Sequence, residues 1–97
     1  MQLKEEQILR LKKFFTDKPV LKAYLFGSYS REEADEESDI DLLVELDYSK
    51  HIGLGFARMK LDLEKLLNKK IDIISAGGVS SYIRPFIDKD KKLIYEK

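Results

Sequence analysis

The clearest structural pattern in the chain lies in the stretch YLFGSYSREEADEESDIDLLVEL, residues 24–46. Its start belongs to an apolar segment, residues 20–26, that predicts a strand and stops sharply at Gly27-Ser28. Its end, residues 39–46, alternates aliphatic residues with Asp39, Asp41 and others, as a second strand does. Residues 29–36 favour a short helix between them. The two strands are therefore expected to be neighbours in one sheet.

The rest of the chain continues this alternation of helices and strands. Apolar residues spaced for helices and short β-branched runs predict the following elements: helices over 3–16 and 54–69, a strand over 71–75, a loop over 76–78, two helical pieces over 79–90 divided near Pro85, and a closing strand over 93–95. This order predicts an α/β fold, a small mixed β-sheet flanked by helices.

Periodic apolar residues indicate which faces of the two long helices are buried. The expected stripes are Leu3, Ile8, Leu11, Phe14 and Phe15 in the first helix, and Phe56, Met59, Leu63, Leu66 and Leu67 in the second. Leu54 and Leu61 lie off the second stripe, either as minor core contacts or as part of a partner surface. Tyr82, Phe86 and Tyr95 are expected to pack within the C-terminal part.

Length and composition exclude several classes of protein. Ninety-seven residues predict one domain, residues 1–97, with no separate substrate domain. Eighteen basic and eighteen acidic residues cancel, so nucleic acid and anionic membranes are not expected as direct partners. The absence of Cys excludes disulfides and thiolate zinc sites, and His51 is the only histidine. No membrane span or signal peptide is evident, so a cytoplasmic protein is expected.

Asp39 and Asp41 are the first candidates for chemistry. Two carboxylates two residues apart on a strand point to the same side, and their mutual repulsion calls for a positive partner. Mg²⁺ suits this arrangement because it prefers oxygen ligands from carboxylates and substrate phosphates. For an isolated Asp-x-Asp, however, a solvated strand end is the commoner interpretation.

Two further features gain meaning from this pair. Gly27 lets the backbone approach a ligand, and Ser28 could cap a following helix whose amides hold a phosphate. Alone, Gly-Ser after a strand is more often a plain turn. Asp72 lies among isoleucines and could complete a site of three carboxylates for two metal ions. The alternative for Asp72 is an edge-strand or salt-bridged aspartate.

Taken together, these residues resemble the minimal nucleotidyltransferases of the DNA polymerase β-like superfamily. That family's motif is Gly-Ser, ten residues, Asp-x-Asp, and a later Asp in a strand. Here the positions are Gly27 and Ser28, then Asp39 and Asp41, then Asp72. Leu25-Phe26 and Arg31 also match. Glu32 departs from the pattern, since family members commonly have glycine after the arginine.

The resemblance implies a nucleotidyltransferase (polymerase beta-like) fold and an enzyme that moves a nucleoside monophosphate, AMP from ATP, to a hydroxyl acceptor. It implies a two-Mg²⁺ site in which Asp39 and Asp41 bind both ions. Asp72 would bind the ion on the nucleophile side and help to take the proton. Gly27 and Ser28 would hold the β- and γ-phosphates. Arg31 is a candidate triphosphate contact or simply an exposed salt-bridging residue.

The resemblance also implies a partner. Minimal nucleotidyltransferases pair with HEPN-domain toxins and act as antitoxins by adding AMP to a tyrosine of the toxin. The alternative is a non-catalytic antitoxin that neutralises its partner by surface contact. An enzyme acting on tRNA or a small antibiotic would need a further binding region that the sequence lacks. Self-association is left open.

Overall fold

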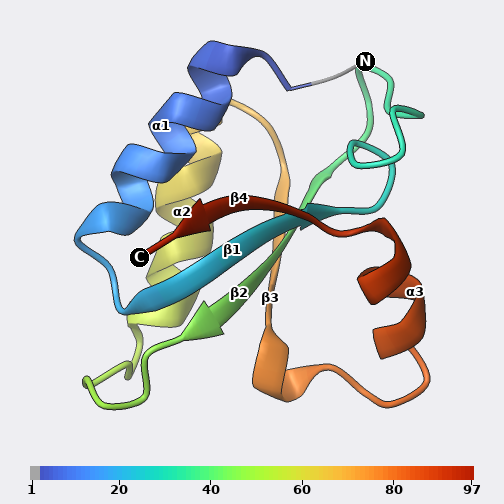
Figure 1. The fold of residues 1–97 in the computed structure, drawn as a ribbon. Helices are drawn as coiled ribbons and strands as arrows, with labels where there is room; N and C mark the ends of the chain where they lie inside the picture. Colours follow the sequence, from blue (N-terminus) through green and yellow to red (C-terminus); the bar gives the residue numbers. More distant parts are fainter. Residues whose placement is uncertain (1–2) are drawn as a thin grey trace.

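The computed structural model describes residues 3–97, which form one mixed sheet with helices around it (Figure 1). The elements in chain order are α1 (Glu5–Thr16), β1 (Val20–Phe26), β2 (Ile40–Leu46), α2 (Gly55–Leu67), β3 (Ile71–Ser75), the 3₁₀ turn η1 (Ala76–Gly78), α3 (Arg84–Asp90) and β4 (Lys92–Glu96). The expected α/β fold is confirmed: the strands at 20–26 and 71–75 have the expected ends, and the ends of the two long helices, β2 and β4 differ by at most two residues.

The strand order in the sheet is β3-β2-β1-β4. Strand β1 runs antiparallel to both β2 and β4, while β2 and β3 are parallel. Parallel neighbours need a crossover, and α2 supplies it between β2 and β3. Strands β3 and β4 are therefore the two edges, and the catalytic candidates on β2 lie inside the sheet.

One apolar cluster holds the helices against one face of the sheet. Leu11 and Phe15 of α1 are fully buried, as is Leu63 of α2. They meet the side chains of Ile40 and Leu42, which point to the same face of β2. The predicted stripes on both helices are confirmed. That residues 1–97 form one independent domain remains a prediction.

Two predicted minor core contacts lie outside this cluster. Leu54 is 88% exposed and Leu61 is 57% exposed, so neither belongs to the core. Their possible use as a partner surface is untested. No helix within residues 3–97 is both long enough and apolar enough to cross a membrane.

The predicted helix over residues 29–36 does not form. Residues 27–32 are a series of turns, in which the Arg31 amide donates to the Gly27 carbonyl at 3.1 Å and the Glu33 amide to the Ser28 carbonyl at 2.9 Å. Glutamates four residues apart in this acidic run would repel one another on a helix, which opposes helix formation. Ser28 therefore caps no helix, and a phosphate site there cannot rest on a helix N-terminus.

The C-terminal part differs from expectation in two ways. Only one helix forms, α3, with Pro85 in its first turn, because residues 79–83 turn instead of continuing a helix. Tyr82 and Phe86 are 87% and 73% exposed, so their predicted packing is wrong. Tyr95 does pack, with its ring centroid 5.8 Å from that of Phe15.

Candidate active site

The centre of the site is a pair of aspartates on neighbouring strands. Asp41 of β2 stands in register with Asp72 of the parallel strand β3. Residues in register share a face, so both carboxylates project from the side of the sheet that does not carry α1 and α2. Asp39 lies two residues before Asp41, immediately outside β2. The structure thus places Asp72 beside Asp41 and Asp39 near enough for its charge to act on Asp41.

Electrostatics at this centre are unfavourable for Asp41. Burial, followed by the nearby negative charges of Asp72 and Asp39, raises the pKa of Asp41 to about 6, although the positive charge of Arg31 acts to lower it. Among residues 3–97, none of the three carboxylates forms a hydrogen bond or an ion pair. A cation placed between them would relieve their repulsion.

Gly27 is fitted to Asp41. Its φ of +75° lies in the left-handed region, which glycine adopts without penalty. A Cβ on residue 27 would lie only 2.1 Å from Oδ2 of Asp41. Any side chain would therefore collide with the carboxylate, so the turn after β1 needs glycine for its conformation and for its contact with the acid site.

Ser28 lies in the same turn and is half-buried. Its carbonyl oxygen accepts from the Glu33 amide, while its hydroxyl has no hydrogen-bond partner in the described part of the chain. A hydroxyl without a partner, one residue after Gly27, can donate to an anionic ligand. The turn thereby offers a phosphate contact through a side chain, in place of the helix amides expected from the sequence.

Arg31 is held on both sides. Its Nη1 lies 2.7 Å from Oδ2 of Asp90, and its Nε lies 3.1 Å from Oε2 of Glu33. Hydrogen bonds to these two acids, with Asp90 first, raise the pKa of Arg31. The hydroxyl of Ser30 also donates to the Asp90 carbonyl, so the last residue of α3 is joined twice to the turn. In the structure Arg31 is thus a salt-bridging residue, which is one of the two interpretations that the sequence left open.

Sequence reasoning missed Asp90. In the sequence it sits within a run of charges, Lys89 to Lys92, that is typical of a solvated turn. Its side chain is nevertheless only 20% exposed, because it is enclosed by the turn after β1. A contact between residues 59 positions apart leaves no local signal in the sequence.

Glu32 adopts a backbone conformation that glycine favours. Its φ is +62°, and Asn68 is the other non-glycine residue with positive φ among residues 3–97. The chain therefore keeps the left-handed turn at the position where the resembling family commonly has glycine. Compared with glycine, Glu32 raises the conformational free energy of this turn but leaves its backbone conformation the same.

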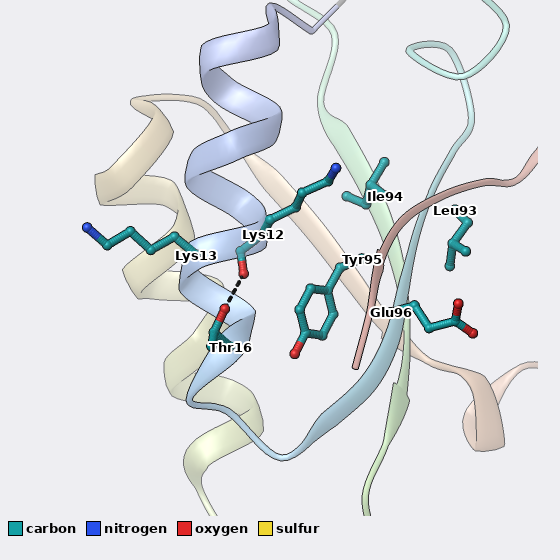
Figure 2. A pocket seen from close by; sticks show the side chains of 7 residues that line it. All are labelled: Lys12, Lys13, Thr16, Leu93, Ile94, Tyr95 and Glu96. Carbon is teal, nitrogen blue, oxygen red and sulfur yellow. Dashed lines mark hydrogen bonds between the residues drawn. The ribbon is translucent and has the colours of Figure 1, made fainter.

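A separate cavity lies away from the three aspartates. About 430 Å³ of space opens between the end of α1 and the edge strand β4, lined by Lys12, Lys13, Thr16 and residues 93–96 (Figure 2). Thr16 is tied there to the Lys12 carbonyl at 2.9 Å. This cavity shares no residue with the three aspartates, so its size gives it no part in the acid site.

Comparison with known proteins assigns the family. The family model described as "Polymerase beta, Nucleotidyltransferase" matches residues 10–97. The chain belongs to this nucleotidyltransferase family. Its members are enzymes that transfer nucleotides, and the resemblance found in the sequence is confirmed.

Individual relatives agree with this assignment. MJ1379 of Methanocaldococcus jannaschii, provisionally named a protein adenylyltransferase, is 39% identical over 94 residues, which cover 93% of this chain and 92% of the relative. A solved structure described provisionally as a minimal nucleotidyltransferase is 36% identical, with a TM-score of 0.64 over 90% of this chain and 85% of its own.

A third match shows the fold alone. It is the complex of a tri-AMPylated HEPN toxin from Shewanella oneidensis with its MNT antitoxin. Its sequence is 22% identical, and its TM-score is 0.65 over 96% of this chain and 70% of the matched one. The mixed sheet and its helices are therefore those of the nucleotidyltransferase fold.

The family implies divalent cations, and the donor set here suits them. Three carboxylates without a positive partner are the oxygen ligands that Mg²⁺ takes in phosphate-transfer sites. No three His, Cys, Asp or Glu side chains among residues 3–97 are already gathered into a metal site. Asp39, Asp41 and Asp72 therefore fit a divalent cation by their chemistry and charge, and they are the residues that would hold it.

Proposed function

We propose that this nucleotidyltransferase moves AMP from ATP to a hydroxyl group of a protein, namely a tyrosine of a HEPN-domain toxin, and so acts as an antitoxin. The observation that carries the proposal is the pairing of Asp41 with Asp72 in the sheet, together with the close approach of Gly27 to Asp41. Support for protein as the acceptor comes from the name of MJ1379. Support for a HEPN partner comes from the Shewanella complex.

In this proposal each residue of the site has one task. Asp39 and Asp41 hold Mg²⁺, and Asp72 holds the ion on the acceptor side and receives the acceptor's proton. When bound, the ions neutralise phosphate charge and make the acceptor hydroxyl more acidic. Ser28 donates its hydroxyl to a β- or γ-phosphate, and Gly27 leaves the room that the phosphates need. Arg31 lies in the same turn, beside the position of the bound nucleotide.

The exposure of the acid site suits a protein acceptor. Asp72 is exposed on the edge strand β3, on the sheet face that does not carry α1 and α2. A side chain presented by another protein can therefore reach the acids from solvent. The balanced net charge gives no general attraction for RNA as the acceptor.

The alternative is that the chain neutralises its partner by contact alone. Co-expression with a HEPN-domain toxin whose activity this chain suppresses separates these functions. Wild-type chain should restore growth, while the double variant Asp39→Asn, Asp41→Asn should fail at equal abundance. Growth restored by the double variant would show that catalysis is not the means of neutralisation.

A further inference from the structure

A small apolar cavity adjoins the turn after β1. Its volume is about 200 Å³, below the range of pockets that enclose a whole drug-sized ligand. The side chains of Phe26, Ile83, Phe86 and Ile87 form its apolar wall. Gly27, Arg31 and Asp90, the last paired with Arg31, form its border with the turn. Phe26 of β1 is paired with Asp41 of β2 in the sheet, so the cavity lies next to the acid site.

One side of this cavity is open to solvent. Ile87 is 4% exposed and fixes α3 to the rest of the chain, whereas Phe86 is 73% exposed and Ile83 is 53% exposed. In Figure 1, α3 stands apart from α1 and α2, beside the end of β1. A phenyl ring that lines a cavity and yet faces solvent can accept a flat ring against it.

The charges at the cavity are already compensated. Arg31 is paired with both Asp90 and Glu33, so it offers no free positive charge to the cavity. A phosphate would gain little here, while the neutral ring system of a base needs no counter-charge. The chemistry of the wall therefore favours a base over the triphosphate.

We propose that this cavity is the nucleobase subsite, in which the base of the triphosphate stacks on Phe86 and Ile83. The proposal rests on the function proposed above, since it requires the phosphates to lie at Gly27 and Ser28. Every base has a face that can stack, so a subsite of this kind discriminates weakly among nucleotides. The chain is then expected to bind ATP and GTP with similar affinity.

Calorimetric titrations with Mg²⁺ and two ligands test this subsite. The ligands are α,β-methylene-ATP, which cannot transfer AMP, and inorganic tripolyphosphate, which has no base. The wild type should bind the nucleotide roughly tenfold more tightly than tripolyphosphate, as stacking of one base implies. Phe86→Ala should abolish that difference without weakening tripolyphosphate binding. Phe86→Tyr should retain it.

Tyr82→Ala is the matched control, because Tyr82 is 87% exposed and does not line the cavity. It should bind both ligands as the wild type does. If Phe86→Ala keeps the preference for the nucleotide, the base lies elsewhere and the subsite is wrong. The same conclusion follows if Phe86→Ala changes only transfer to the protein acceptor. If the wild type binds neither ligand, the proposed function itself fails.

Discussion

Asp41 and Asp72 face one another across the parallel strands β2 and β3, and no cation among residues 3–97 forms an ion pair with either of them. The two carboxylates repel one another in the folded state. The apolar core buries Ile40 and Ile71, one residue before these acids, and so helps to fix the two strands that carry the carboxylates. The predictions that follow test this relationship and the turn built against it.

Replacing Asp41 by Asn should stabilise the metal-free protein in a way that depends on pH. The pKa of Asp41 is about 6 in the fold and 3.8 in the unfolded chain, so the folded state binds more protons between these values. The free energy of unfolding of the wild type should therefore fall as pH rises from 4 to 6, and the variant should escape this loss.

Denaturant unfolding with a chelator present measures the effect. We expect Asp41→Asn to be more stable than the wild type by about 1–2 kcal/mol at pH 7, with no difference near pH 4, after allowance for solvent screening. Mg²⁺ should stabilise the wild type and not the variant. An equal difference at both pH values would mean that the Asp41 charge is not the cause.

The Gly27→Ala variant tests the contact between the turn and the acid site. The new methyl group would meet the Asp41 carboxylate and force an alanine into positive φ, so we expect a loss of about 1–3 kcal/mol in the free energy of unfolding. Mg²⁺ binding, followed by calorimetry, should weaken as well.

Gly55→Ala provides the control, since nothing lies within 4 Å of a Cβ on residue 55, at the start of α2. Alanine favours a helix there, so this variant should be neutral or more stable by up to about 1 kcal/mol. If both alanine variants behave alike, the turn after β1 does not depend on glycine.

Glu32→Gly should stabilise the protein. Glu32 holds φ of +62°, which costs a side-chain residue about 1–2 kcal/mol that glycine avoids. Some of this gain is offset because glycine gives the unfolded chain more freedom, so we expect a net gain of about 0.5–1 kcal/mol. Thermal melts in parallel with Glu36→Gly, in the same acidic loop but without positive φ, give the comparison. A loss of stability in Glu32→Gly would contradict this view of the turn.

These positions also show how far the sequence predicts the structure. The alternation of Ile40, Leu42 and Val44 with Asp41, Leu43 and Glu45 predicted the face of β2 that packs on the helices, because strand geometry assigns side chains to faces by local spacing alone. The same spacing put Asp39 and Asp41 on the opposite face. The chemical role proposed for them also needs Asp72, which the family motif indicated.

Contacts between distant parts of the chain could not be predicted in this way. The link of Asp90 to Arg31 depends on where α3 ends in space, and the exposure of Phe86 depends on what covers α3. The helix expected over 29–36 failed for a related reason. The turn is fixed by Gly27 against Asp41 and by Ser30 against Asp90, and these tertiary contacts override local propensity.

Asp90→Asn should loosen the attachment of α3 to the turn. The Arg31–Asp90 pair is 2.7 Å long and partly enclosed, so its loss should lower the free energy of unfolding by about 1 kcal/mol. Asp88→Asn removes a more exposed pair with Lys91 and should change stability by less than half as much. Equal effects in chemical denaturation would show that the Asp90 contact is an ordinary surface pair.

In the proposed function, Asp39, Asp41 and Asp72 form the site at which AMP passes from ATP to a partner protein. Intact-mass measurement of a HEPN-domain toxin, after incubation with this chain, ATP and Mg²⁺, is the most direct test. We predict one or more added AMP groups with the wild type and with Asp62→Asn, a carboxylate variant on α2 outside the site. Asp41→Asn should give none. An unchanged mass with the wild type, or equal AMP addition by Asp41→Asn, would contradict the account.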